Sequence, residues 1–525
     1  MNAAVPVEHE GWDAIVIGGG IGGLIAAAYL ARWRKRVLLL EARETFGGRA
    51  ETNVLIEGVS APVAAEIVYA LDPQVIRDFK LYQRGLRYVE RAMPLVALHP
   101  SGRHLELSHE FFAARSAIRK ESVADARAYI HFRRELFAFA RRMRPLWAPP
   151  NAWMARRNPG GSVASISQEF ALSSADTERL DRAAHSSADA YLERWFDTDA
   201  LKTALAFDAT IDGVGPEESS SALMLVWRAA QECDGTQGAA GQVEGGPGAL
   251  AKALATVARE EGATLRPMSH VVGIVLTKGK AAGVTLDNGM TINAPIVLSS
   301  LSASQTFGSL LPADAQPFGT LASPDMPARV ASAKVLVALN GLPPFAGLSR
   351  HALRGRLVVA ERPESVSEAK SASLLGILPE NLVVEATIPT IADPSLSQNG
   401  LHVLSLRIPY LPAHPQAGWT ANRDVLQKRV LSMLEVYAPG LSDRIVASAV
   451  LTPEDFRVRY GAAHGRSNLL ERLLQPYETR IRTPVEGFYL CGADAEPADA
   501  ISGRSGRIAA MIALAETRDA GRTLS

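Results

Sequence analysis

DAIVIGGGIGGLIAAAYLARWRKRVLLLE, residues 13–41, is the segment of this chain with the most specific structural pattern. Four apolar residues lead into the glycine-rich segment GGGIGG, a helical pattern of small residues follows, and a second apolar run ends at Glu41. This order predicts a strand, a tight turn, a helix and a second strand. The G-x-G-x-x-G spacing, with an acidic residue about twenty positions later, is typical of a dinucleotide-binding βαβ unit.

The glycines of this turn have separate tasks in such a unit. Gly18 allows the sharp turn, Gly20 lets the backbone approach a pyrophosphate, and Gly23 lets the helix pack closely on the strand. Gly22 belongs to the same segment, whose N–H groups face the phosphates, and the Glu41 carboxylate can accept hydrogen bonds from a ribose. The alternative is a glycine-rich turn in an ordinary α/β unit, which does not explain why a carboxylate ends the apolar strand.

Composition sets the broad class of the protein. A chain of 525 residues is too long for one hydrophobic core and predicts about two to four domains. The 55 basic and 55 acidic residues cancel, so no overall field points to nucleic acid. Two cysteines, Cys233 and Cys491, are too few for a disulfide framework and fit a reducing compartment, and no pattern resembles a metal site. We therefore expect a soluble, cytoplasmic protein without a metal.

One uncharged run, residues 14–31, is long enough for a hydropathy scan to flag a membrane span or a signal peptide. Acidic residues precede this run and glycines interrupt it, so we reject both interpretations. The helical pattern of 108–144 is rich in arginine and is most simply a solvated face. A peripheral contact with an anionic membrane, or a surface for an acidic substrate, is the alternative.

Patterns along the chain return twice more to the nucleotide-binding unit. A glycine-rich turn opens a helix that ends near Glu261, and short strands with an Asp-Asn-Gly turn at 287–289 then predict a three-stranded meander. A final strand and helix complete the unit. We expect an α/β fold with a Rossmann-like domain that is discontinuous, formed by 11–53, 238–300 and 484–517.

The segments between these returns, 54–237 and 301–483, form the expected second domain, and 518–525 form a tail. The first segment is mostly helical, with helices predicted over 108–144, 175–193 and 198–209. The second has alternating apolar runs that predict an antiparallel sheet. We expect an α+β substrate-binding domain, with the reactive end of a bound dinucleotide at the interface between the domains.

Further motifs surround the three segments. They are GGR at 47–49, GGPG at 245–248, TPVEGFYLCGAD at 483–494 and SGRSGRIAA at 502–510. With the first turn, they resemble the flavin amine oxidase and phytoene desaturase superfamily of FAD oxidoreductases. DPQVIRD at 72–78 and YGAAHG at 460–465 are similar to its phytoene-dehydrogenase-like branch, whose members carry a pyridine nucleotide-disulfide oxidoreductase-like domain. The resemblance implies tightly bound FAD rather than NAD.

On the adenosine side, the resemblance carries roles over by position. The glycines of the first turn would hold the pyrophosphate, and Glu41 the adenosine ribose. Arg49 would lie near the diphosphate, and Arg43 and Gly48 are counted with it among the cofactor-binding residues. From the residues alone, a solvent loop is the alternative for this segment. Val271 would meet the adenine through its backbone.

On the flavin side, Gly492 and Asp494 would meet the ribityl–phosphate end. Ile501, also counted as cofactor-binding, precedes a helix whose N-terminus would face the flavin pyrimidine edge, where reduced flavin carries negative charge. One departure from the branch is clear. Its members usually follow the Cys-Gly pair with His-Pro and a glycine run, where this chain has EPADA at 496–500. We expect these side chains to crowd or charge the space beside the flavin ring.

Two residues are catalytic candidates. Lys334, inside an apolar strand, is similar in setting to the amine-oxidase lysine that holds a water at flavin N5, and a strand-edge lysine that reaches solvent is the alternative. His464 is a candidate acid or base, or a histidine that only hydrogen-bonds a loop. Cys491 and Tyr489 are expected in the core, with a covalent flavin link at Cys491 as the less favoured alternative.

The expected function is an FAD-dependent dehydrogenase or desaturase that acts on an apolar or amphipathic small molecule, with O2 or a quinone as electron acceptor. The first alternative is an amine oxidase that uses O2, which is weakened because no aromatic pair stands near the C-terminal motif. The second is a non-catalytic lipid- or prenyl-binding relative, against which Glu41 and the GGR motif argue. A homodimer is an open expectation.

Overall fold

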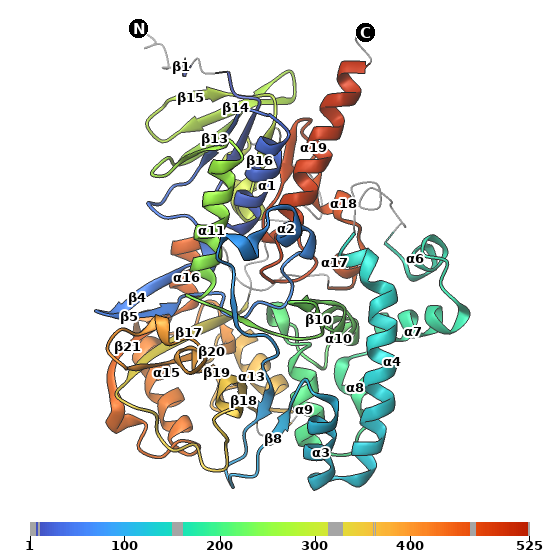
Figure 1. Ribbon diagram of the computed structural model, residues 1–525, viewed down its shortest axis with the longest axis vertical. Helices are drawn as coiled ribbons and strands as arrows, with labels where there is room; N and C mark the ends of the chain where they lie inside the picture. The colour runs from blue at the N-terminus through green and yellow to red at the C-terminus, as the bar shows by residue number, and fades with distance from the viewer. Residues whose placement is uncertain are drawn as a thin grey trace.

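The computed structural model describes residues 11–149, 161–312, 329–360, 364–461 and 469–522, together with Val7, Glu8, Ala315 and Arg362. Figure 1 shows the Rossmann-like part in the upper half of the view, with a second sheet at the lower left and a layer of helices at the lower right. The predicted α/β class with a Rossmann-like domain is confirmed. His464 lies outside the described residues.

The central sheet of the Rossmann-like part has five parallel strands in the order β12-β3-β2-β16-β22. The strands are β2 (Ala14–Ile17), β3 (Val37–Leu40), β12 (Thr264–Arg266), β16 (Val297–Ser299) and β22 (Phe488–Leu490). The helices α1 (Ile21–Arg32), α11 (Pro247–Glu260) and α19 (Arg504–Arg522) pack beside it (Figure 1). Apolar residues fill β2 and β3 completely because helices and neighbouring elements cover both faces of a parallel sheet.

The predicted meander is present as β13 (Val271–Thr277), β14 (Lys280–Leu286) and β15 (Thr291–Asn293), joined antiparallel. A short strand, β1 (Val7–Glu8), pairs parallel with β15. Gly289 of the predicted Asp-Asn-Gly turn has a φ of 81°, a conformation that glycine adopts without strain. The meander therefore folds as its local turn chemistry dictates.

The second sheet has seven strands in the order β21-β17-β20-β19-β18-β7-β8. Its strands are β7 (Leu95–Ala97), β8 (Leu105–Leu107), β17 (Val330–Leu339), β18 (Arg356–Val359), β19 (Val384–Thr387), β20 (His402–Pro412) and β21 (Ile445–Leu451). All its pairs are antiparallel except β7 with β18. The sequence predicted the antiparallel sheet within 301–483 alone, but two strands of the first inserted segment extend it.

Serine caps divide two of the predicted helices. The arginine-rich pattern over 108–144 forms α3 (Phe111–Glu121) and α4 (Val123–Trp147), because Ser122 between them accepts a hydrogen bond from the Asp125 N–H. The prediction over 175–193 likewise forms α7 (Ser174–His185) and α8 (Ala188–Glu193), with Ser187 as the cap of the second.

The remaining helices of the lower layer are α6 (Val163–Glu169), α9 (Asp199–Phe207) and α10 (Ser221–Ala230). The other elements are β4 (Thr52–Ile56), β5 (Val59–Pro62), α2 (Pro73–Asp78), β6 (Tyr88–Glu90), β9 (Glu232–Cys233), β10 (Thr236–Gln237), β11 (Gln242–Val243), α12 (Ala303–Gln305), α13 (Glu364–Leu374), α14 (Pro389–Ala392), α15 (Gly418–Glu435), α16 (Pro453–Tyr460), α17 (Leu469–Leu474) and α18 (Tyr477–Ile481).

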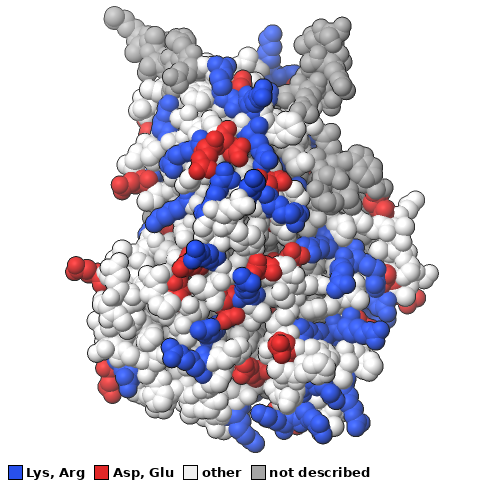
Figure 2. All heavy atoms as spheres, in the orientation of Figure 1, with Lys and Arg blue, Asp and Glu red and all other residues white. Residues whose placement is uncertain are grey.

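The basic helices face solvent over much of their length. Figure 2 shows Lys and Arg side chains gathered over the region where Figure 1 places α3 and α4. Several of these arginines have local acceptors, since Arg142 pairs with Asp176 at 2.7 Å and Arg144 pairs with Glu232. No helix within the described ranges combines the length and apolarity needed to cross a bilayer.

Candidate functional site

A cavity of about 840 Å³ opens between the Rossmann-like part and the second sheet. Its wall begins at the first glycine turn and the end of β3, continues along Gly47–Ala50, and reaches side chains of β17, β18, β19 and β20. A volume of this size is at the upper end of the range for small-molecule and cofactor sites. The cavity therefore joins the predicted dinucleotide site to the second sheet.

The first turn leaves space for a ligand at Gly20. Gly18 has a φ of 90°, and a Cβ on Gly23 would lie 2.1 Å from the Gly18 carbonyl oxygen, so these glycines are required by the turn and its packing. A Cβ on Gly20, in contrast, would meet no atom closer than 3.9 Å. No side chain caps the start of α1, so its first N–H groups are available to an anion.

Glu41 is buried and held in one orientation by backbone donors. Its Oε2 accepts a hydrogen bond from the Gly19 N–H at 2.6 Å, and its Oε1 accepts one from the Arg43 N–H at 3.0 Å. The Arg43 guanidinium lies 3.6 Å from the same carboxylate and also pairs with Glu51 at 3.1 Å. The carboxylate is therefore positioned at the cavity wall, where the sequence predicts contact with a ribose.

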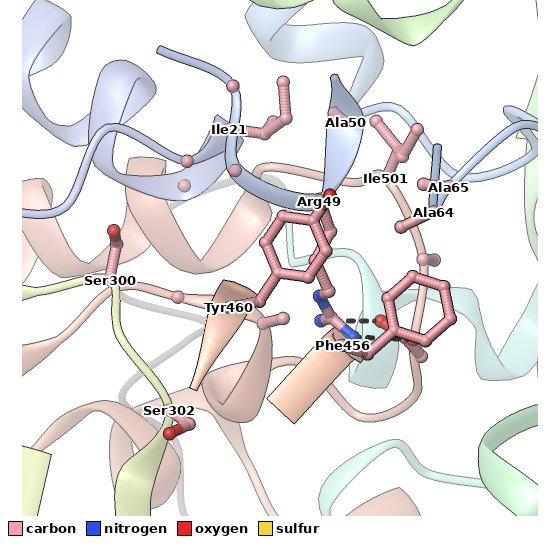
Figure 3. Close-up of a pocket in the computed structure, with 18 of the residues that line it drawn as sticks. Ile21, Arg49, Ala50, Ala64, Ala65, Ser300, Ser302, Phe456, Tyr460 and Ile501 are labelled. Carbon is pink, nitrogen blue, oxygen red and sulfur yellow. Dashed lines mark hydrogen bonds and ion pairs between the residues drawn. The ribbon is translucent and has the colours of Figure 1, made fainter. Parts of the chain in front are cut away.

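Arg49 and Asp499 form a bidentate ion pair across the cavity. Arg49 Nη1 and Nη2 donate to the two carboxylate oxygens at 3.0 Å each, as the dashed lines in Figure 3 show. Tyr69 donates its hydroxyl to the Asp499 carbonyl oxygen at 2.7 Å. The EPADA segment therefore does bring a charge to this space, but the arginine of the GGR motif neutralises it.

The other predicted cofactor residues also meet at this cavity. Val271, Gly492, Asp494 and Ile501 line it together with Gly22, Gly48 and the residues above, whereas Gly23 is buried behind the turn. Asp494 Oδ2 accepts a hydrogen bond from the Ala303 N–H at 2.6 Å. A Cβ on Gly492 would lie 2.4 Å from the Ser300 carbonyl oxygen, so only glycine fits there. Eleven of the twelve predicted cofactor residues, drawn from distant parts of the sequence, therefore line one cavity.

The start of α19 is partly occupied by a side chain of the protein itself. The Ser505 N–H donates to Glu496 Oε1 at 2.7 Å, and Glu496 Oε2 accepts from the Tyr477 hydroxyl at 2.6 Å. Ser502 and Gly503 still line the cavity. The glutamate of the EPADA segment therefore uses one N–H of the helix that the sequence predicts to face the flavin.

Lys334 is buried on an interior strand. β17 lies between β21 and β20, and the Lys334 side chain is 5% exposed, so the alternative of a strand-edge lysine that reaches solvent is wrong. Its Nζ lies 2.9 Å from Glu66 Oε2, and Glu66 also accepts hydrogen bonds from Thr387 and from Ser405 at 2.6 Å. The ammonium lines the cavity, and its catalytic role stays a prediction.

A charge cluster at the second sheet, in which Arg356 and Glu385 are buried, was not predicted from the sequence. Arg356 donates to Glu385 at 2.6 Å and to Asp208 at 2.7 Å, and Arg407 donates to Glu385 at 2.8 Å. Burial acts to raise the pKa of Glu385, but the two arginines outweigh it and hold the pKa at about 2. The available signal was a single charged residue inside each of three apolar strand patterns, RLVV, VEAT and HVLSLRIPYLP.

An aromatic pair also lines the cavity. The Phe456 and Tyr460 rings, on α16, stack with centroids 6.0 Å apart and an interplanar angle of 24°, and Figure 3 labels both among the lining residues. Tyr460 donates its hydroxyl to Glu51. Their i, i+4 spacing was visible in PEDFRVRY, which lies well before the C-terminal motif and so did not count as a pair near it.

The two cysteines are buried and unpaired by disulfides. Burial raises the pKa of the Cys233 thiol to about 12 and raises that of Cys491 further. Tyr489 is buried as expected, with its hydroxyl bonded to Glu516. Among the described residues, no three side chains of His, Cys, Asp or Glu are grouped as metal ligands.

Known proteins are similar to this chain in sequence and in fold. A model of the NAD(P)-binding Rossmann-like domain matches residues 16–82. Pyridine nucleotide-disulfide oxidoreductase domain-containing protein 2 of Mus musculus is 28% identical, over 97% of this chain and 94% of that protein. The neurosporene-forming phytoene desaturase of Cereibacter sphaeroides is 27% identical, over 96% of this chain and 94% of that protein.

A solved structure of putrescine oxidase with a redesigned cofactor site superposes with a TM-score of 0.62 at 16% identity, covering 97% of this chain and 99% of that one. This likeness shows a shared fold. The relatives span nearly the whole chain, and the Rossmann-like match falls on the segment that holds the first glycine turn and Glu41. The chain is therefore an oxidoreductase that is similar in sequence to phytoene desaturases and shares its fold with putrescine oxidase.

Proposed function

We propose that this protein is an FAD-dependent dehydrogenase or desaturase that removes a hydride from a C–H bond of an apolar or amphipathic substrate. The observation that carries the proposal is one cavity that runs from the dinucleotide turn to the second sheet. Bound FAD would supply the hydride acceptor at flavin N5. The protein has to bind the substrate, orient its C–H bond and keep water away.

The residues around the first turn fit FAD. The space at Gly20, the uncapped start of α1 and the fixed Glu41 carboxylate match a diphosphate followed by a ribose. Val271, at the start of β13, would meet the adenine, and Gly492 and Asp494 would meet the ribityl–phosphate end, since all three line the cavity. These roles follow from the family resemblance and stay part of the proposal.

Beyond the cofactor residues, the cavity wall combines apolar and charged side chains. Ile67, Ile211 and Val330 offer apolar contact, and the Lys334–Glu66 pair keeps an ammonium fixed at the same wall. Lys334 could hold a water or a substrate polar group in place through its remaining N–H bonds. This mixture supports an amphipathic substrate more than a purely apolar one.

An amine oxidase that uses O2 is the second candidate. Two observations favour it, the buried Lys334 and the stacked Phe456–Tyr460 pair, which supplies aromatic faces within the same cavity. Substrate-dependent release of hydrogen peroxide would support this candidate. A non-catalytic lipid- or prenyl-binding role is the third, and a purified protein that stays colourless after incubation with FAD would support that one.

The decisive experiment is anaerobic reduction of the FAD-loaded protein against a panel of amines, polyenes and amphipathic lipids, with bleaching of the flavin as the readout. Bleaching by a lipid or polyene, followed by reoxidation with a quinone faster than with O2, supports the proposed dehydrogenase. Bleaching by amines alone, with rapid reoxidation by O2, contradicts it. Sedimentation of the same sample tests the expected homodimer, and flotation with anionic vesicles tests a peripheral membrane contact.

A further inference from the structure

The inner wall of the cavity carries an arginine that lacks a carboxylate of its own. Arg228, on α10, is only 4% exposed and lines the cavity. Its guanidinium lies 4.5 Å from the centre of the Tyr69 ring. Its Nη1 atom is buried without a hydrogen-bond partner, and among the described residues no carboxylate lies within ion-pair distance of its side chain.

The neighbouring carboxylates are already engaged. Asp208 and Glu385 accept from Arg356, and Glu385 also accepts from Arg407. Three arginines therefore share two carboxylates on this wall, and Arg228 is the one without a direct bond. Burial lowers the pKa of Arg228, and the more distant Asp208 only partly opposes this effect. A buried cation in this state gains most from an anion that arrives with a ligand.

A chain of side-chain contacts connects Arg228 to the predicted cofactor residues. Arg228 packs on Tyr69, Tyr69 donates to the Asp499 carbonyl oxygen, and Asp499 pairs with Arg49 of the GGR motif. These contacts connect the arginine to the predicted dinucleotide residues, and both line the same cavity. An anion bound at Arg228 would belong to a molecule that also extends along the apolar wall formed by Ile67 and Ile211.

We propose that Arg228 binds the carboxylate of an amphipathic substrate. The proposal rests on the proposed function and names the substrate class of the same site. A planar guanidinium binds a carboxylate through two parallel hydrogen bonds, and the single positive charge by which these three arginines exceed their two carboxylates matches a monoanion. A phosphate monoester carries about two negative charges and would leave buried negative charge in excess. An amine would repel the arginine.

Calorimetric titration of the FAD-loaded protein tests this inference without any hydride transfer. The probes are octanoate, octanol, octylamine and octyl phosphate at constant ionic strength. The variants are Arg228→Met, Arg228→Lys and, as a matched control, Arg457→Met, which removes an exposed arginine paired with Glu454. We expect wild type to prefer octanoate, and Arg228→Met to bind octanoate about tenfold to a hundredfold more weakly with octanol binding unchanged.

Arg228→Lys keeps the positive charge but not the planar guanidinium, so its affinity for octanoate should lie between those of wild type and Arg228→Met. If Arg228→Met does not fold, a loss of affinity in Arg228→Lys supports the proposal and unchanged affinity overturns it. Equal binding of octanoate and octanol, preference for octyl phosphate, or loss of FAD from Arg228→Met would each overturn it. If octanoate binds through Arg228 but no compound bleaches the flavin, the proposed function fails and the carboxylate site stands.

Discussion

Replacing Glu385 with glutamine should destabilise the protein by about 3–5 kcal/mol, because removing one partner of a buried ion pair leaves the other uncompensated. Glu385 is 6% exposed and bonds both Arg356 and Arg407. Its pKa falls from 4.5 to about 2, which corresponds to about 3 kcal/mol by linkage and agrees in magnitude. Urea unfolding followed by tryptophan fluorescence measures the change.

The same prediction has a pH dependence with a definite sign. Because the folded-state pKa is lowered, the stabilisation is fully present above pH 4.5 and is lost as the pH falls towards 2. From pH 6 to pH 3, the gap between wild type and Glu385→Gln should shrink by about 2 kcal/mol. Glu454→Gln, at an exposed pair, is the matched control and should cost less than about 1 kcal/mol. A Glu385→Gln protein as stable as that control, or a gap that does not narrow in acid, refutes the reasoning.

Three further predictions concern the cofactor and the lysine. Glu41→Ala should lower FAD occupancy, and unchanged flavin content would count against the ribose assignment. Gly20→Ala should fold normally, since its Cβ would meet no atom closer than 3.9 Å, yet it should lose FAD because the methyl group enters the cavity. Gly22→Ala should lose thermal stability even without FAD, because its Cβ would lie 2.0 Å from the Cys491 carbonyl oxygen. The reverse pattern would contradict the turn geometry. Lys334→Met should slow anaerobic flavin bleaching at least about tenfold with FAD content unchanged. Lys280→Met, which removes a lysine from an exposed pair with Glu486, should leave the bleaching rate unchanged. Equal bleaching rates in the two variants would show that Lys334 takes no part in the reaction.

The parts of the fold that depend on neighbours in sequence were predictable. The first turn follows from the spacing of its glycines, and the meander follows from an Asp-Asn-Gly turn between apolar runs. The helix boundaries at Ser122 and Ser187 were also encoded locally, as serines whose side chains accept from N–H groups three residues later. The long apolar and arginine periodicity concealed these caps.

Contacts between distant segments were not predictable from one sequence. Arg49 and Asp499 are 450 positions apart, and nothing in either segment indicates the other as its partner. Glu385 and Arg407 face each other because β19 and β20 pair in one register, which the strand patterns alone do not fix. The predicted cofactor residues therefore follow from motifs, whereas the ion pairs across the cavity lining and the second sheet result from packing between distant segments.

We propose that three separate segments build a cradle for FAD whose reactive end meets the second sheet. The most direct test is the amount of FAD released by acid from the purified, FAD-incubated protein. We predict about one FAD per chain, all of it released by acid, because Cys491 is buried and is not among the residues that line the cavity, so we expect no covalent link. A protein that stays colourless and takes up no FAD would contradict the claim.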